Sequence, residues 1–251
     1  MQIRHLANAG VLIRGSCNIL IDGLTCADGL YPSTSVEEGR AIQCGIAPFE
    51  NLDLIIFTHE HPDHFDPDAC ARFLAENKDV VVMMNRASLS MIKEKVDDDA
   101  KSRVIVPEHA TYKFGSSVVN AYPIAHDGGR SYEDVEHFAI LIELDKKKIL
   151  HTGDAGFKDA DVTSWEFPAK KIDWMITAFP NIGLPNAREK VREQIAPHHI
   201  IAVHFPLPEA DTYGWTKATK ESVAKFRQSG LEEGSIPSIL LCDGIGEEFD
   251  E

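Results

Sequence analysis

The sequence places four potential metal ligands within six residues, His59, His61, Asp63 and His64, directly after an apolar run at 52–57. Imidazole and carboxylate groups are the ligands that Zn²⁺ and similar divalent cations take from proteins. His59 and His61 lie two residues apart in a segment expected to be extended, so their side chains point to the same side and both can reach one ion. This spacing indicates a metal-binding site.

The segment 52–57 is short, β-branched and almost wholly apolar, which predicts a strand buried on both faces. The four ligands then lie at the C-terminal end of that strand. Pro62 stops the strand and prevents a full helix, so we expect the chain to turn Asp63 and His64 back toward the same space, where one cluster could hold two ions. A zinc-protease helix is excluded, because it needs a second histidine where this chain has Asp63.

Three later residues, His126, Asp154 and His204, each come at the end of an apolar, strand-like segment. Taken singly, each has an ordinary interpretation as an exposed histidine or a turn residue. The cluster at 59–64 leaves ligand positions to fill, which favours these residues as further ligands. The histidines at 198–199 enter their strand from the opposite end, so His204 is the better candidate.

The pattern His59-x-His61-x-Asp63-His64 after an apolar strand resembles the signature of the metallo-β-lactamase-fold hydrolase superfamily. The resemblance covers residues 2 to about 205 and implies an α/β fold, the four-layered αβ/βα sandwich, with the site in the cleft between the sheet edges. It implies a first ion held by His59, His61 and His126, a second ion held by Asp63, His64 and His204, and Asp154 bridging the two.

The resemblance also implies hydrolysis of an ester-like bond, such as a lactone or phosphodiester, by water activated at a dinuclear metal centre. Asp63, His59 and His61 are the expected catalytic residues, with Asp63 orienting the attacking hydroxide. Imidazole-rich sites suit Zn²⁺ best, and Mn²⁺ or Fe²⁺ also fits the carboxylates. Within the superfamily, the sequence resembles the single-domain group that includes the L-ascorbate-6-phosphate lactonase.

Other residues are expected to support this centre. Considered alone, Asp22 is typical of a turn aspartate before glycine. The resemblance implies instead that it braces the metal-binding loop by hydrogen bonds. His137 is a candidate for the substrate pocket or a polar cap of the following strand. Tyr213 and Trp215 lie in an aromatic loop that either packs normally or forms the wall of the substrate pocket.

Alternating strands and helices are expected to position these residues. The expected strands are 2–6, 10–14, 18–22, 52–57, 79–84, 104–106, 111–114, 117–122, 138–144, 148–151, 172–177, 200–203 and 238–241. The expected helices are 35–43, 67–76, 86–96, 186–195 and 217–228. The acidic run 247–251 is expected to be a solvated tail.

Composition limits the classes of partner. The 251 residues, 43% of them hydrophobic, predict one domain over 1–251. A formal net charge of −15 argues against nucleic acid. Five irregularly spaced cysteines predict free thiols in a reducing compartment. No segment approaches the roughly 20 apolar residues of a membrane span, so we expect a cytoplasmic protein with a small-molecule substrate. The oligomeric state is open.

Relatives with a different organisation fit the sequence less well. Glyoxalase-type thioesterases need a helical domain after the last ligand, RNA-processing members need an inserted domain and a basic surface, and exported β-lactamases need a signal sequence. Two alternatives of another class stay open. The same ligand set could hold iron in a non-heme redox enzyme or sensor, or it could stabilise a metal-binding module without catalysis.

Overall fold

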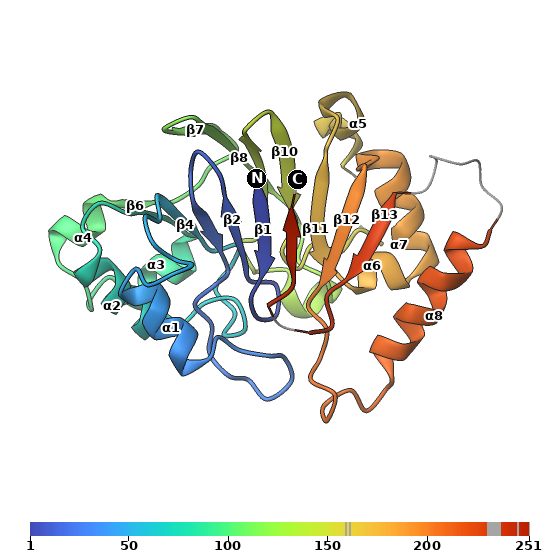
Figure 1. The fold of residues 1–251 in the computed structure, drawn as a ribbon, viewed down its shortest axis with the longest axis horizontal. Helices are drawn as coiled ribbons and strands as arrows, with labels where there is room; N and C mark the ends of the chain where they lie inside the picture. Colours follow the sequence, from blue (N-terminus) through green and yellow to red (C-terminus); the bar gives the residue numbers. More distant parts are fainter. Residues whose placement is uncertain (159, 161, 230–236, 245, 251) are drawn as a thin grey trace.

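The computed structural model describes residues 1–158, 160, 162–229, 237–244 and 246–250. Within these residues the strands form two seven-stranded sheets that face each other (Figure 1). The first sheet has the order β14 (Glu248–Asp250), β1 (Gln2–His5), β2 (Val11–Arg14), β3 (Ile19–Ile21), β4 (Leu54–Ile56), β5 (Val81–Met83) and β6 (Val104–Ile105). The second has the order β13 (Ser238–Leu241), β12 (His199–Val203), β11 (Trp174–Ala178), β10 (Lys147–His151), β9 (Phe138–Leu144), β8 (Ser117–Pro123) and β7 (Thr111–Phe114).

Helices cover the outer face of each sheet (Figure 1). Those on the side of the first sheet are α1 (Val36–Gln43), α2 (Pro67–Glu76), α3 (Arg86–Ile92) and α4 (Asp98–Ser102). Those on the side of the second sheet are α5 (Phe167–Lys170), α6 (Pro180–Gly183), α7 (Pro185–Lys190) and α8 (Trp215–Arg227). Two 3₁₀ turns, Gly129–Tyr132 and Thr163–Trp165, lie in loops. This arrangement confirms the expected four-layered αβ/βα sandwich.

The central strands are apolar on both faces because both faces are covered. In β3, Ile19 and Ile21 enter the core between the sheets, whereas Leu20 packs under the helices of the first sheet. In β11, Ile176 enters the core between the sheets and Met175 packs under the helices of the second. Alternation along each strand thus builds three apolar layers from uninterrupted hydrophobic runs.

Strand direction brings the ends of distant segments to one edge. Strand β3 is parallel to β4, and β10, β11 and β12 are parallel to one another. Strand β8 is antiparallel to β9, which is antiparallel to β10, so β8 and β10 run the same way. The loops that follow β3, β4, β8, β10 and β12 carry the predicted ligands and Asp22, so these loops can meet at one end of the sandwich.

Several segments differ from the expected elements. Helices α4, α5 and α6 were not expected, and the expected helix 86–96 ends at Ile92. The expected helix 186–195 is divided, because α7 ends at Lys190 and Val191–Ile195 forms a π-helical turn. The acidic run was expected to be a solvated tail; its described part is a strand rather than a free tail, although the Glu248 side chain is exposed. Residues Glu248–Asp250 form β14 beside β1, because Phe249 packs against the core between the sheets and Glu248 pairs with Arg4 at 2.9 Å. Residue 251 lies outside the described part.

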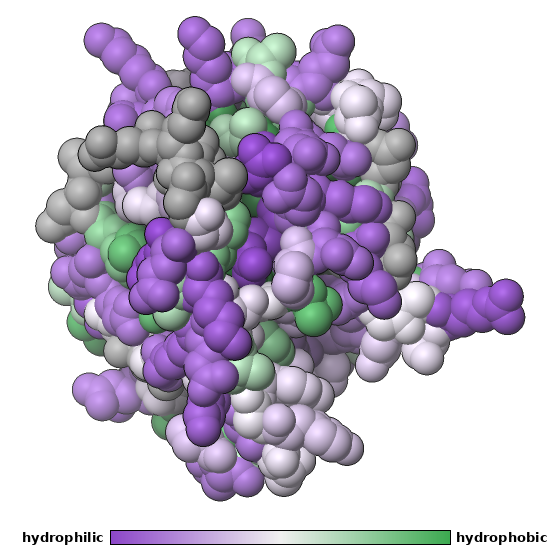
Figure 2. Space-filling view, turned by 90° about the vertical axis from the view of Figure 1, so that its right-hand side faces the viewer, coloured by the Kyte–Doolittle hydropathy of each residue, from purple (hydrophilic) through white to green (hydrophobic). Residues whose placement is uncertain are grey.

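The face that carries α8 is largely hydrophilic (Figure 2). Among the described residues, no helix combines the length and the apolar character needed to span a bilayer.

Stability should depend most on the core between the sheets. Ile140 in β9 is completely buried there, and Ile140→Ala should lower the free energy of unfolding by about 2–5 kcal/mol through lost contacts and a cavity. Val36→Ala, at a side chain that is 93% exposed, should change it by no more than about 0.5 kcal/mol. Urea unfolding followed by circular dichroism measures both. Equal effects of the two substitutions would contradict this assignment of the core.

Candidate metal centre

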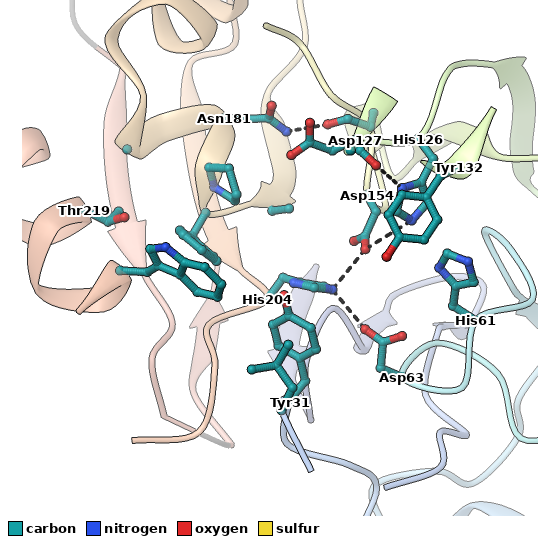
Figure 3. Close-up of a pocket in the computed structure, with 18 of the residues that line it drawn as sticks. Tyr31, His61, Asp63, His126, Asp127, Tyr132, Asp154, Asn181, His204 and Thr219 are labelled. Carbon is teal, nitrogen blue, oxygen red and sulfur yellow. Dashed lines mark hydrogen bonds and ion pairs between the residues drawn. The ribbon is translucent and has the colours of Figure 1, made fainter. Parts of the chain in front are cut away.

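The structure brings all seven predicted ligands together, in two adjoining groups. Within each group, one potential ligand atom from each residue lies within 4.8 Å of the others. Figure 3 shows how the residues of the second group that it labels converge from different loops toward the same space. The first group comprises His59, His61 and His126, and the second comprises Asp63, His64, Asp154 and His204.

The first group consists of three imidazoles. His59 Nε2 and His61 Nδ1 are 3.0 Å apart, and the His126 ring lies 4.9 and 4.7 Å from the rings of His59 and His61. Two nitrogen atoms bound to one tetrahedral Zn²⁺ at 2.0–2.1 Å would lie roughly 3.3 Å apart. The nitrogen atoms are therefore spaced as ligands of one ion require.

The second group combines two imidazoles with two carboxylates. His204 Nε2 lies 3.0 Å from Asp154 Oδ2 and 3.1 Å from Asp63 Oδ2 (Figure 3). His64 Nε2 lies 3.2 Å from Asp154 Oδ1. Asp154 Oδ2 is also 3.6 Å from His126 Nε2 in the first group. The Asp154 carboxylate thus lies between the groups, where a bridging ligand would be needed.

The buried carboxylate of Asp22 fixes which nitrogen of two histidines carries a proton. It accepts hydrogen bonds from the Thr58 amide at 2.8 Å, the Thr58 hydroxyl at 2.7 Å and His64 Nδ1 at 2.8 Å. Because the Asp22 carboxylate accepts from His64 Nδ1, His64 Nε2 is the nitrogen that faces Asp154. The Thr58 hydroxyl uses its hydrogen in the bond to Asp22, so its oxygen accepts from His59 Nδ1 at 3.1 Å, and His59 Nε2 is left to face the centre.

His126 is oriented in the same way by backbone. Its Nδ1 donates to the carbonyl of Asp127 at 2.5 Å, so Nε2 is directed at the centre. The Asp127 amide in turn donates to the carbonyl of Asp154 at 2.7 Å. The two loops that follow β8 and β10 are thereby joined next to the ligands they carry.

His137 lies behind the centre and holds the Asp154 backbone. Its Nδ1 donates to the carbonyl of Ile124 at 3.2 Å, and its Nε2 accepts from the Asp154 amide at 3.0 Å. Burial lowers the pKa of His137 to about 3, so the ring is neutral, as an accepting Nε2 requires. Gly153 makes this contact possible, because a Cβ there would lie 2.5 Å from the imidazole.

Burial and opposing charges set the pKa values of the histidines and of Asp154 in the two groups. Burial lowers the pKa of His59 well below its ordinary value. Burial acts the same way on His64 and His204, but Asp154 outweighs it, so the pKa of His64 lies well above its ordinary value and that of His204 rises to about 9. Burial would raise the pKa of Asp154, yet His204 and His64 hold it well below its usual range. The buried carboxylates therefore draw positive charge into this space.

The residues fit a pair of divalent cations. Among the described side chains, His64 Nε2, His126 Nε2 and Asp154 Oδ1 are buried and make no hydrogen bond. Buried polar atoms without partners are rare and costly, and these three belong to one cluster of metal-type ligands. Cations bound between them would satisfy all three atoms and the carboxylate charge at once.

Asn8 also contacts this cluster, although no sequence pattern selects it. Its Nδ2 donates to Asp63 Oδ2 at 3.0 Å and to the Asp63 carbonyl at 2.9 Å. The Asn8 carbonyl accepts from His5 Nε2 at 2.8 Å, and the neighbouring Ala9 carbonyl accepts from His151 Nε2 at 2.9 Å. The turn after β1 is thus a fixed support for Asp63, and no local pattern distinguishes it from an ordinary turn.

A cavity of about 630 Å³ opens over the two groups. Trp215 lines this cavity. Of the two possibilities stated for the aromatic loop, this is the one in which it forms the wall of a pocket. Tyr213 does not line the cavity. This residue is 79% exposed, and its ring stacks on the ring of Trp215 with centroids 5.3 Å apart. His137 does not line it either and is only 2% exposed, because both of its nitrogens are used inside the wall.

Two tyrosines line the cavity and were not singled out from the sequence. The Tyr31 ring lies 3.9 Å from the His204 ring, and the Tyr132 ring lies 4.7 Å from the His126 ring (Figure 3). Both come from long loops without a regular pattern. Position in such a loop was the available signal, and it does not identify individual residues.

Comparison with known proteins agrees with this geometry. The sequence model of the Beta-lactamase superfamily domain matches residues 18–210. The chain is 25% identical over 197 residues to the UPF0173 metal-dependent hydrolase of Staphylococcus haemolyticus, an alignment that covers 72% of this chain and 81% of that protein.

Two solved structures share the fold. The metallo-beta-lactamase fold protein YhfI from Bacillus subtilis matches with a TM-score of 0.62 and 12% identity, over 99% of this chain and 98% of its own. A mutant of CmlA beta-hydroxylase matches with a TM-score of 0.68 and 16% identity, over 99% of this chain and 53% of its own, so this chain spans about half the length of that one. Since the family match covers most of its length, the chain belongs to the Beta-lactamase superfamily domain family, within the metallo-β-lactamase superfamily of metal-dependent hydrolases.

Proposed function

We propose that this metal-dependent hydrolase cleaves an ester-like bond of a small molecule, such as a lactone or a phosphodiester, at a centre of two divalent ions. The observation that carries the proposal is the pair of adjoining ligand groups with the Asp154 carboxylate between them. Zn²⁺ suits the imidazole majority best, and Mn²⁺ or Fe²⁺ would also be accepted by the carboxylates.

In this proposal His59, His61 and His126 hold one ion, and Asp154 is shared with a second ion held by Asp63, His64 and His204. When bound, two such ions lower the pKa of a shared water molecule toward neutrality and polarise the oxygen atom of the bond that is cleaved. The protein contributes rigid ligands, because Asp22, His137 and the Asp127 carbonyl already fix the orientation of the groups they contact.

Asp63 is suited to orient the attacking water and accept its proton. Burial would raise the pKa of this carboxyl, but His204 and His64 lower it below its ordinary value, so the group is ionised. Asn8 and His204 hold Oδ2, which fixes the direction of the carboxylate. Tyr31 keeps its proton, because burial and the nearby Asp154 and Asp63 raise its pKa, and its hydroxyl can donate to a substrate oxygen.

A second candidate is a non-heme iron redox enzyme that uses the same residues. The fold likeness to a chain named as a beta-hydroxylase supports testing it. Hydrolysis consumes no oxidant, so identical rates with and without oxygen would support the first proposal. A rate that requires oxygen would support the second.

We also propose a small-molecule partner in the cytoplasm, without nucleic acid or membrane. The net charge of −15 supports this, because nucleic-acid phosphates and anionic membrane surfaces both bind clustered lysine and arginine.

Metal content and activity should change together. The purified protein should contain two ions per chain by mass spectrometry of the metals, and exhaustive chelation should reduce turnover of a panel of lactones, phosphodiesters and thioesters by at least about a hundredfold. Zn²⁺ should restore it. His126→Ala and His204→Ala should each lower the metal content by one ion, whereas His109→Ala, at an exposed histidine, should keep both. Full activity after metal removal would refute the proposal.

The contact between Asp22 and the two histidines gives a second test. Asp22→Asn presents an amide that can donate toward Thr58 or His64 and so disturbs which imidazole nitrogen is free. We expect metal affinity to fall about 10–100-fold, measured by competition with a chromogenic chelator. Asp98→Asn, at a fully exposed carboxylate, is the matched control and should leave the affinity unchanged. Equal affinities in the two variants would mean that Asp22 does not orient the ligands.

A further inference from the structure

The cavity over the candidate metal centre has two unlike sides. On one side lie the imidazole and carboxylate groups of the centre (Figure 3). The opposite side comes from the end of β11, from α6 and the residue after it, and from the start of α8. Apart from Asn181 and Thr219, its side chains are apolar: Ala178, Phe179, Pro180, Leu184, Trp215 and Ala218.

This apolar side, which we call the apolar wall, is held in place by close contacts. The Asp211 carboxylate accepts from the amides of Trp215 at 2.7 Å and Thr216 at 2.9 Å, so the first turn of α8 is fixed. Helices α6 and α8 approach closely at Gly183, where a Cβ would lie 2.6 Å from Thr219 Oγ1. A wall that is already formed binds a ligand without first having to be ordered.

The apolar wall leaves hydrophobic surface uncovered. Leu184 is 47% exposed and Trp215 is 37% exposed, although both are large apolar residues. Covering them with an apolar group of a ligand would be favourable, at about 25 cal/mol for each Å² removed from water.

The cavity also lacks a partner for a second anionic group. None of the described residues that line it is lysine or arginine. The residues outside the described part contain no lysine or arginine either. The charged side chains away from the centre are Asp28 and Asp127. A phosphate or sulfonate at a distance from the metal centre would therefore meet carboxylates and apolar carbon, which disfavours it.

We propose that the substrate carries an uncharged aryl or alkyl group beside its labile bond, and that this group lies against Phe179, Leu184 and Trp215 while the bond meets the metal centre. The inference rests on the proposed hydrolysis at that centre. It separates this chain from lactonases of phosphorylated sugars, whose substrates carry an anionic group away from the bond that is cleaved.

The test compares two probes that differ by one charge. Binding of 1-naphthol and of 1-naphthol-4-sulfonate to the metal-loaded protein is measured by isothermal titration calorimetry, and hydrolysis of the corresponding acetates is measured alongside. We expect the uncharged probe to bind at least about tenfold more tightly and its acetate to have the higher kcat/KM. Trp215→Ala should weaken binding of 1-naphthol about tenfold.

A matched pair of charge variants excludes a general effect of the acidic protein. Leu184→Arg places a cation in the apolar wall and should reduce or reverse the preference for the uncharged probe. Ile46→Arg makes the same change of charge at a residue that is 53% exposed and does not line the cavity, and should keep the preference.

The two proposals fail differently. Equal binding of the two probes, or equal preferences in the two arginine variants, would overturn the inference while leaving hydrolysis untouched. A preference for the uncharged probe without turnover of either acetate or of the lactone, phosphodiester and thioester panel would instead refute the proposed function and retain the apolar wall as a binding surface.

Discussion

The buried carboxylate of Asp22 is the constraint on which the centre depends. A buried carboxylate must be satisfied by several donors, and Asp22 has three from Thr58 and His64. These donors are in reach because β3 and β4 are parallel and Ile21 is opposite Ile56. A shift of one residue in this register would turn the donors away from Asp22 and would free the imidazoles to rotate. The register of two core strands therefore decides which nitrogen atoms face the space for the ions.

The core between the sheets joins the two halves of the sandwich at the centre. The loop after β4 supplies four ligands, the loops after β8, β10 and β12 supply the other three, and the core between the sheets keeps these loops in contact. Three residues that touch the centre without being glycine, Asn8, Asp22 and His204, have positive φ angles of 52°, 46° and 66°. Such backbone conformations cost of the order of 1–3 kcal/mol each for ordinary residues and persist only where the surroundings enforce them. At these three positions, the hydrogen bonds of Asn8 and Asp22 and the contact of His204 with Asp63 help to hold the backbone in this conformation.

The sequence predicts the parts of this arrangement that are encoded locally. Each predicted ligand ends a strand, and strands covered on both faces are conspicuous as apolar runs, so His126, Asp154 and His204 could be selected before any contact was known. Asn8 could not, because its importance comes from a contact with Asp63, 55 positions away. His137 was expected at the pocket or as a cap, and its actual role depends on the Asp154 amide that its Nε2 meets. The strand β14 was missed because a single Phe249 among acidic residues gives no apolar run. In the structure, the Phe249 ring packs against the core between the sheets and β14 pairs with β1.

The apolar wall and the charged centre act on each other. Coulomb interactions strengthen as the surrounding dielectric falls, so an apolar substrate group that covers Phe179, Leu184 and Trp215 and displaces water would strengthen the attraction between the Asp154 carboxylate and its cationic partners. An apolar wall therefore does more than bind a substrate group, because covering it with that group would raise the cost of leaving the centre without positive charge. Covering the wall with a substrate would remove more water from the cavity and strengthen the interactions of Asp63 and Asp154 at the stage when a proton has to be accepted.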